Sequence, residues 1–89
     1  MNTKPNTSER AHLRRVKELP CSVCGAPGPS DAHHIEQALP YTCIALCKDC
    51  HQGSHNGLHG QRAMWRVMKT TELCALNITI KRLMEANQP

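Results

Sequence analysis

The sequence predicts a small α+β domain in which two short strands lie between helices and paired cysteines hold a structural metal ion. Three observations lead to this fold class. The chain has 89 residues, which suits a single domain spanning 1–89. It contains one Trp, one Tyr and no Phe, so the apolar core is small and needs a further staple. Its six cysteines include two Cys-x2-Cys pairs, which can supply that staple.

The N-terminal part is predicted to be a polar lead followed by a basic helix. Residues 1–6 are polar and are expected to be disordered. The helix is expected over 8–19, because Thr7 or Ser8 can cap its start and Pro20 stops it.

The central segment, 20–60, is predicted to be a metal-stapled ββα core. Residues 20–31 contain three Pro and two Gly, a composition typical of a turn. Two short strands are expected over 32–37 and 41–46. A short helix is expected over 48–56, although the glycine within it lowers its stability by about 1 kcal/mol relative to alanine.

The C-terminal part, 61–86, is predicted to hold two helices. The first covers 61–69 and turns three apolar side chains inward: Met64, Val67 and Met68. The second covers 72–85, begins at a Thr70 or Thr71 cap, and repeats apolar side chains at 3-4-3 spacing. These side chains are Leu73, Leu76, Ile80 and Leu83. Such a seam suits packing onto its own domain, and the alternative is homodimerisation.

Four cysteines form the most specific motif of the chain: Cys21, Cys24, Cys47 and Cys50. Zn²⁺ takes four thiolates tetrahedrally, and a two-residue gap lets both sulfurs of a pair reach one ion. The alternatives are two disulfides or free thiols. Cys43 and Cys74 fall outside the pattern and are expected to be small buried hydrophobic residues.

The expected compartment is a reducing cytoplasm. The first residues contain no apolar segment of the kind found in secretory signals, and no apolar run is long enough to span a membrane. In such a compartment, cysteines are metal ligands or free thiols more often than disulfides.

Five of the six histidines lie between His33 and His59. His33 and His34 are adjacent on a predicted strand, so their side chains should point to opposite faces. His51 and His55 are four apart, which would place both on one face of the predicted helix. This clustering of histidines predicts a second metal site. The alternative is that they are surface histidines without a catalytic or metal-binding role. His59 could be a spare metal ligand, but it is expected to touch phosphate or solvent. The sixth histidine, His12, is expected at the surface.

The order Cys-x2-Cys, Asp-Ala-His-His-Ile, Leu-Cys-x2-Cys-His and His-Asn-Gly resembles the HNH (ββα-metal, or His-Me finger) endonucleases. It is most similar to the small zinc-stapled phage type, which includes Ref-like nucleases, and it covers about residues 20–60. The resemblance implies a ββα-metal fold with a structural zinc. It also implies DNA cleavage in the cytoplasm of a bacterial or phage-infected host cell.

The resemblance also implies roles for single residues. His34 matches the general base, and His33 matches a metal ligand on the same strand. His51 and His55 match the ligands on the helix. The middle Asn of the family, which orients the base, falls at Thr42 here, and a threonine hydroxyl could hold an imidazole or brace the loop.

The chemistry of these residue types suits phosphodiester hydrolysis. A divalent ion stabilises charge on the leaving 3′ oxygen, and a neutral histidine can take the proton of the attacking water. The expected products carry a 5′ phosphate and a 3′ hydroxyl. Mg²⁺, Mn²⁺, Ni²⁺ and Zn²⁺ are all candidates for the active-site cation.

The formal net charge is +4, which excludes an acidic tail and favours a phosphate-bearing partner. Two rows of cations are predicted to contact DNA, either double-stranded or branched. These rows are Arg10, Arg14, Arg15 and Lys17, and Arg62, Arg66 and Lys69. Each row could instead be an ordinary solvated face. The alternative function is a non-catalytic zinc-binding adaptor for DNA or protein.

Overall fold

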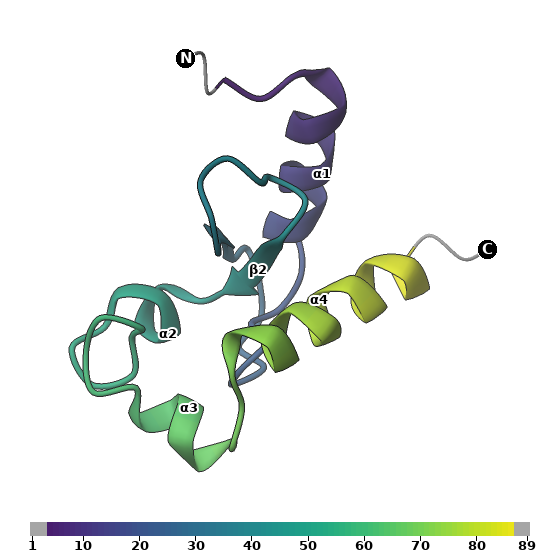
Figure 1. Cartoon of the computed structure of the whole chain (residues 1–89). Coiled ribbons are helices and arrows are strands. Elements are labelled where there is room, and N and C mark those ends of the chain that lie inside the picture. Colours follow the sequence, from purple (N-terminus) through teal and green to yellow (C-terminus); the bar gives the residue numbers. More distant parts are fainter. Residues whose placement is uncertain (1–3, 87–89) are drawn as a thin grey trace.

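The structure is a computed structural model that describes residues 4–86. It is an α+β arrangement with a two-stranded antiparallel sheet. Figure 1 shows α1 and α4 close to the sheet, while α2 and α3 lie together at the opposite end of the molecule. The elements are α1 (Thr7–Lys17), β1 (Asp31–His34), β2 (Cys43–Leu46), α2 (Lys48–Gln52), α3 (Ala63–Val67) and α4 (Glu72–Ala86).

Helix α1 begins one residue earlier than the sequence pattern indicated. Its N-cap is Asn6, whose side chain accepts a hydrogen bond from the Glu9 backbone N–H at 2.8 Å. The Glu9 carboxylate in turn accepts from the Asn6 backbone N–H at 2.8 Å, which completes a capping box. The predicted caps, Thr7 and Ser8, are therefore wrong, because this reciprocal pair satisfies the first amides. The predicted disorder of 1–6 fails at Asn6, and residues 1–3 lie outside the described part.

The two strands are shorter than predicted. They pair in the register Asp31↔Leu46, Ala32↔Ala45, His33↔Ile44 and His34↔Cys43. The predicted strand segments 35–37 and 41–42 belong instead to a wide loop. One further bond crosses between these segments, from the Ile35 N–H to the Thr42 carbonyl at 3.3 Å. Beyond it, backbone hydrogen bonds close local turns, such as the bond from the Leu39 N–H to the Glu36 carbonyl at 3.0 Å. The sheet therefore ends at His34.

Strand β2 is the centre of the core, because all four of its residues are buried. Side chains alternate across the strand, so Ile44 and Leu46 belong to one apolar cluster and Cys43 and Ala45 to another. The first cluster joins β2 to the cysteine pairs, α3 and α4: it contains Cys21, Val23, Ile44, Leu46, Cys50, Leu58, Trp65 and Ala75. The second joins β2 to α1 through Val16.

Helix α2 ends at Gln52, four residues before its predicted end. Gly53 has extended backbone angles (φ −64°, ψ 147°), which stops the helix. Residues 53–62 then coil tightly, and the Gly57 N–H donates to the Gly53 carbonyl at 2.8 Å. A Cβ at Gly57 would collide with the Gly53 backbone, so glycine is required at this close approach. The predicted start of this helix at residue 48 is therefore confirmed, whereas its predicted end at residue 56 is wrong.

Helix α3 is shorter than predicted, and a different side chain anchors it. Val67 and Met68 are 70% and 53% exposed, whereas Trp65 is buried. The Trp65 indole N–H donates to the Cys50 carbonyl at 3.1 Å, which ties α3 to the second cysteine pair. The prediction that Val67 and Met68 point inward is wrong, because Trp65 offers more apolar area and a polar group with a partner. Met64 packs partly against the core, as expected.

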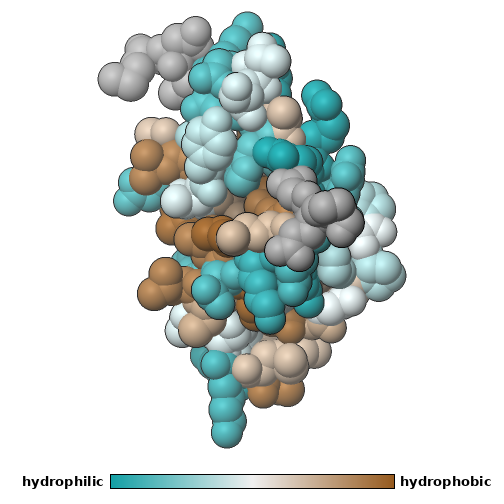
Figure 2. All heavy atoms as spheres, turned by 90° about the vertical axis from the view of Figure 1, so that its right-hand side faces the viewer, coloured by the Kyte–Doolittle hydropathy of each residue, from teal (hydrophilic) through white to brown (hydrophobic). Residues whose placement is uncertain are grey.

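Helix α4 confirms one predicted cap and half of the predicted seam. The Thr71 hydroxyl accepts from the Cys74 backbone N–H at 3.2 Å, as an N-cap does. Leu76 and Leu83 pack against the two core clusters. Leu73 and Ile80 are 75% and 43% exposed, because the inward stripe also uses small residues. Figure 2 shows apolar side chains in a band at mid-height, below the mostly hydrophilic end that holds α1.

Thr79 is a buried polar junction between three elements. Its hydroxyl lies 2.7 Å from the Ser22 hydroxyl, accepts from the Ala45 backbone N–H at 3.3 Å, and donates to the Ala75 carbonyl at 3.0 Å. Its side chain is fully buried. Loss of these bonds would leave buried hydrogen-bond donors without a partner, and water cannot reach them to replace it.

We therefore expect Thr79→Val to lower the free energy of unfolding by about 1–3 kcal/mol, since it leaves the Ser22 hydroxyl and the Ala45 amide without their shared partner. Urea unfolding followed by circular dichroism measures the change. Thr70→Val is the matched control, because the contact of the Thr70 hydroxyl with the Thr71 carbonyl is exposed and long, at 3.5 Å. Equal losses in the two variants would contradict the role assigned to Thr79.

Candidate functional site

The four paired cysteines converge on one point. Their sulfur atoms all lie within 4.8 Å of one another, so the cluster could hold a metal ion such as zinc. The Sγ atoms of Cys24 and Cys47, one from each pair, are 3.7 Å apart. Cys21 and Cys50 are buried, whereas Cys24 is exposed. All six cysteines of the chain are free thiols, so the sulfurs are available as ligands.

Backbone amides surround the sulfurs and favour the thiolate form. The Cys21 Sγ accepts from the N–H groups of Val23 at 3.4 Å and Cys24 at 3.5 Å. Burial opposes ionisation of Cys21, but the amides outweigh it and lower the thiol pKa to about 7. Cys47 is the N-cap of α2, and its Sγ accepts from the Cys50 N–H at 3.4 Å, but burial raises the pKa of the Cys47 thiol. Burial and the neighbouring thiolates raise the pKa of Cys50, so a bound cation would be needed to ionise all four thiols.

The two remaining cysteines have opposite environments. Cys43 is 1% exposed in β2, and burial raises its pKa to about 11, as expected for a small hydrophobic residue. Cys74 is exposed on α4, so the prediction that it is buried is wrong. Its side chain lies on the outward stripe of the helix next to Leu73. Hydrogen bonding to Thr71 lowers its pKa.

A second feature is a pocket of about 370 Å³ that brings histidines from three segments together. His33 and His34 come from the end of β1, and His51 comes from α2. His59 comes from residues 53–62, which we call the glycine-rich loop. Arg62 and Glu72 line the same pocket. We call this cavity the histidine pocket.

Two histidines of this pocket are each held by a carboxylate. The His33 Nε2 atom lies 3.0 Å from the Glu72 carboxylate, and the His51 Nδ1 atom lies 3.1 Å from Asp31. The His33 and His51 rings are 5.1 Å apart between centroids. This arrangement leaves Nδ1 of His33 and Nε2 of His51 for other partners, as carboxylates do when they orient histidine ligands.

Asp31 also connects the pocket to the surface. Its second carboxylate oxygen lies 3.2 Å from the Lys48 ammonium. The hydrogen bond to His51, followed by the charge and hydrogen bond of Lys48, holds the pKa of Asp31 below its usual value. Asp31 therefore stays ionised as a partner for the His51 ring.

His55 lies apart from the other predicted ligands. It is exposed beyond the end of α2, so the prediction that His55 shares one helix face with His51 is wrong. Gly53 ends the helix before residue 55, which is four positions after His51. Within residues 4–86, the four cysteines are the one group of three or more metal-binding side chains that already converge.

Thr42 fills one of its two expected roles, whereas His12 departs from its expected position. The Thr42 hydroxyl donates to the Leu39 carbonyl at 2.9 Å, so of its two proposed roles it braces the loop. His12 is half-buried, and its ring lies 4.9 Å from that of Tyr41. Burial, with the nearby Arg15 charge, lowers the pKa of His12. The expectation of an ordinary surface histidine was therefore wrong.

Three residues in or next to the histidine pocket are not predicted, or only partly predicted, by the sequence pattern. Asp31 carries a usable signal, because it stands two positions before His33 and so shares its strand face. Glu72 carries none, since it is 39 residues from its partner and has the position of an ordinary first-turn helix acid. His59 was expected only as a phosphate contact or an exposed side chain, and the loop places it in the pocket.

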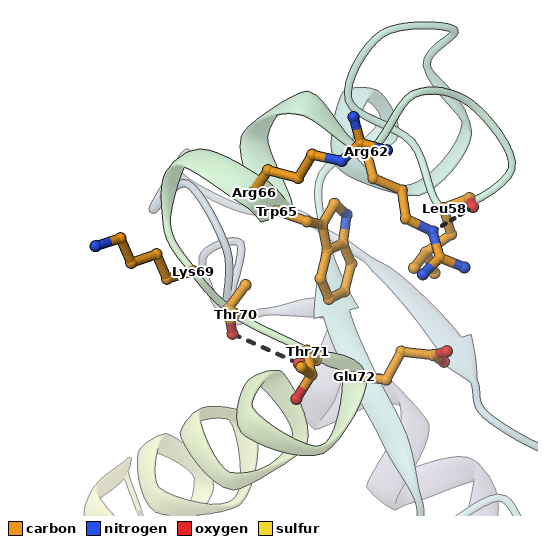
Figure 3. A pocket seen from close by; sticks show the side chains of 8 residues that line it. All are labelled: Leu58, Arg62, Trp65, Arg66, Lys69, Thr70, Thr71 and Glu72. Carbon is orange, nitrogen blue, oxygen red and sulfur yellow. Dashed lines mark hydrogen bonds between the residues drawn. The ribbon is translucent and has the colours of Figure 1, made fainter.

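A third feature is a neighbouring pocket of about 470 Å³ lined by the predicted C-terminal cation row. Figure 3 shows the Arg62 guanidinium beside Leu58, to the right of the Trp65 ring, and the Arg66 side chain passing above the ring, while the Lys69 ammonium points outward at the left. We call it the arginine pocket. The predicted alignment on one helix fails, because Arg62 and Lys69 flank α3 with left-handed backbone (φ 55° and 51°). The N-terminal row is exposed along α1: Arg10, Arg14, Arg15 and Lys17.

The chain matches no known family model, and no curated protein or solved structure is significantly similar to it. None of the helices within residues 4–86 is long and apolar enough to cross a membrane.

Proposed function

We propose that this protein is a metal-dependent DNA endonuclease of the HNH type, stapled by one structural zinc ion. The observation that carries the proposal is the pairing of His33 and His51, each oriented by its own carboxylate, beside His34 in one pocket. Paired imidazoles with carboxylate partners are a usual way to hold a divalent cation. His34 then supplies the base.

In this proposal the cysteine cluster positions the histidines and takes no part in the reaction. A zinc ion on the four thiolates would fix the loop before β1 and the start of α2. His51 directly follows Cys50, and β1 pairs with the strand that leads into Cys47. The staple would therefore set the distance between His33 and His51. Folding of such a site is coupled to metal binding.

Different residues of the chain would have different roles in the reaction. His33 and His51 would hold the active-site cation (Mg²⁺, Mn²⁺, Ni²⁺ or Zn²⁺), which supplies Lewis acidity for the leaving 3′ oxygen when bound. His34 would take the proton from the attacking water. The carboxylates Glu72 and Asp31 keep the two ligand rings in place. Cations of the histidine and arginine pockets and of α1 would contact DNA phosphates.

Plasmid cleavage tests the proposal. Supercoiled DNA should be nicked by the zinc-loaded protein with at least one of the four candidate cations, and His33→Ala or His51→Ala should reduce nicking at least about 100-fold. His12→Gln, purified in parallel, controls for contaminating nuclease. His55→Ala decides between two ligand sets: unchanged nicking supports His33 and His51 alone, whereas lost nicking supports the three-histidine set.

Absence of cleavage with every cation would refute the enzyme proposal. One zinc per chain and DNA affinity unaffected by His33→Ala and His51→Ala would then support the alternative, a non-catalytic zinc-binding adaptor. A homodimer through α4 also remains a proposal, since Leu73, Ile80 and Met84 are exposed along that helix.

A further inference from the structure

The arginine pocket concentrates positive charge that the protein itself does not neutralise. Arg62 and Arg66 line it, and within residues 4–86 neither forms a salt bridge with a carboxylate. Glu72 also lines the pocket, but its carboxylate is engaged by His33 at 3.0 Å. Two guanidinium groups in a concave site are well suited to bind a phosphate, since their N–H groups match its oxygens.

Arg62 is held in place by its backbone conformation and by a hydrogen bond of its side chain. Its backbone is left-handed (φ 55°), a conformation that glycine or asparagine adopts more easily. It stands at the N-cap of α3 but gives no side-chain capping hydrogen bond. Its Nε donates instead to the Leu58 carbonyl at 2.9 Å, which fixes the guanidinium and leaves its terminal N–H groups for a ligand. Strain of this kind is common at binding sites.

The helix that carries Arg66 is also fixed. Trp65, the adjacent residue, is 3% exposed and donates to the Cys50 carbonyl. Cys50 belongs to the four-cysteine cluster. The arginine pocket is therefore placed relative to the candidate metal centre by a buried side chain.

The arginine pocket and the histidine pocket are adjacent. Leu58, Arg62 and Glu72 line both of them. A single strand of nucleic acid could therefore place neighbouring phosphates in the two cavities.

We infer that Arg62 and Arg66 bind one internal backbone phosphodiester of a DNA strand whose neighbouring phosphate occupies the histidine pocket. The inference rests on the proposed function for the identity of its ligand. It adds a positioning site that fixes the strand next to the reacting phosphate.

DNA binding without added divalent cation tests the inference apart from cleavage. Anisotropy of a labelled duplex is measured from ~50 to ~200 mM salt for the wild type, Arg62→Gly and Arg66→Gln. Each variant should bind about tenfold more weakly at the low end and should reduce the salt slope by about 1, the value for one lost phosphate contact. Glycine accepts the left-handed backbone, so Arg62→Gly should not lower Tm. If Arg62→Gly nevertheless folds poorly, Arg66→Gln still tests the same pocket.

Lys81→Ala is the matched control, because it removes one positive charge from the exposed face of α4. Equal slopes for Lys81→Ala and the two arginine variants would overturn the inference. So would losses seen only with a duplex that carries a terminal 5′ phosphate, since the ligand would then be a monoester. If the wild type never cleaves but the arginine variants lose slope as expected, the phosphate site is supported and the nuclease proposal is refuted. Cleavage by the wild type with unchanged binding by both variants would instead support the nuclease and refute the phosphate site.

Discussion

Cys50→Ser is expected to leave the chain largely unfolded at room temperature and unable to retain zinc. Cys50 is 1% exposed within the main apolar cluster, and its sulfur lies within 4.8 Å of the other three. Structural zinc sites contribute apparent binding free energies of about 10–16 kcal/mol, whereas a whole domain is stable by about 5–15 kcal/mol. A core with a single tryptophan cannot replace that contribution. Circular dichroism and the zinc content of the purified protein measure the effect.

Two cysteines outside the cluster make the test specific. Cys74→Ser should change neither zinc content nor stability, because this side chain is exposed on α4. Cys43→Ser should keep its zinc but lose about 1–3 kcal/mol, since the hydroxyl would be buried in β2. A folded Cys50→Ser protein with wild-type Tm would show that the cluster is not the staple of this fold.

The cysteine pattern predicted more of the fold than any helix or strand signal did. The two-residue gaps and their Pro- and Gly-containing turn were enough to predict a four-sulfur cluster, because metal geometry restricts such pairs tightly. Element ends were harder to predict. The caps at Asn6 and Gly53 depend on a reciprocal hydrogen bond in one case and on an extended backbone in the other. Neither is visible as hydrophobic periodicity.

The histidine site was predictable only in part for a related reason. His33 and His51 are brought together by strand pairing and the cysteine pairs, which the sequence pattern indicates. The position of His55 depended on helix length, which the tight Gly53–Gly57 contact overrides. Glu72 reaches His33 only because α4 packs on β2, a tertiary contact without a local signature.

His34→Ala is expected to reduce DNA cleavage about 10²–10⁴-fold, the usual contribution of a general base. The loss should appear in the rate constant, since His34 is not assigned a role in binding the cation. DNA affinity and zinc content should therefore match those of the wild type. His33→Ala and His51→Ala should instead raise the cation concentration needed for half-maximal cleavage, as expected when ligands are lost.

His59 is a second candidate for the general base, because it also lines the histidine pocket. Single-turnover rates of His34→Ala and His59→Ala, measured at saturating cation, distinguish the two. A large loss in His34→Ala with a small one in His59→Ala supports the assignment of His34. The reverse would move the base to the glycine-rich loop, and the strand histidine would then act only as part of the pocket wall. If His34→Ala cuts as fast as the wild type, this histidine takes no proton, and the resemblance to the HNH endonucleases fails at its catalytic residue.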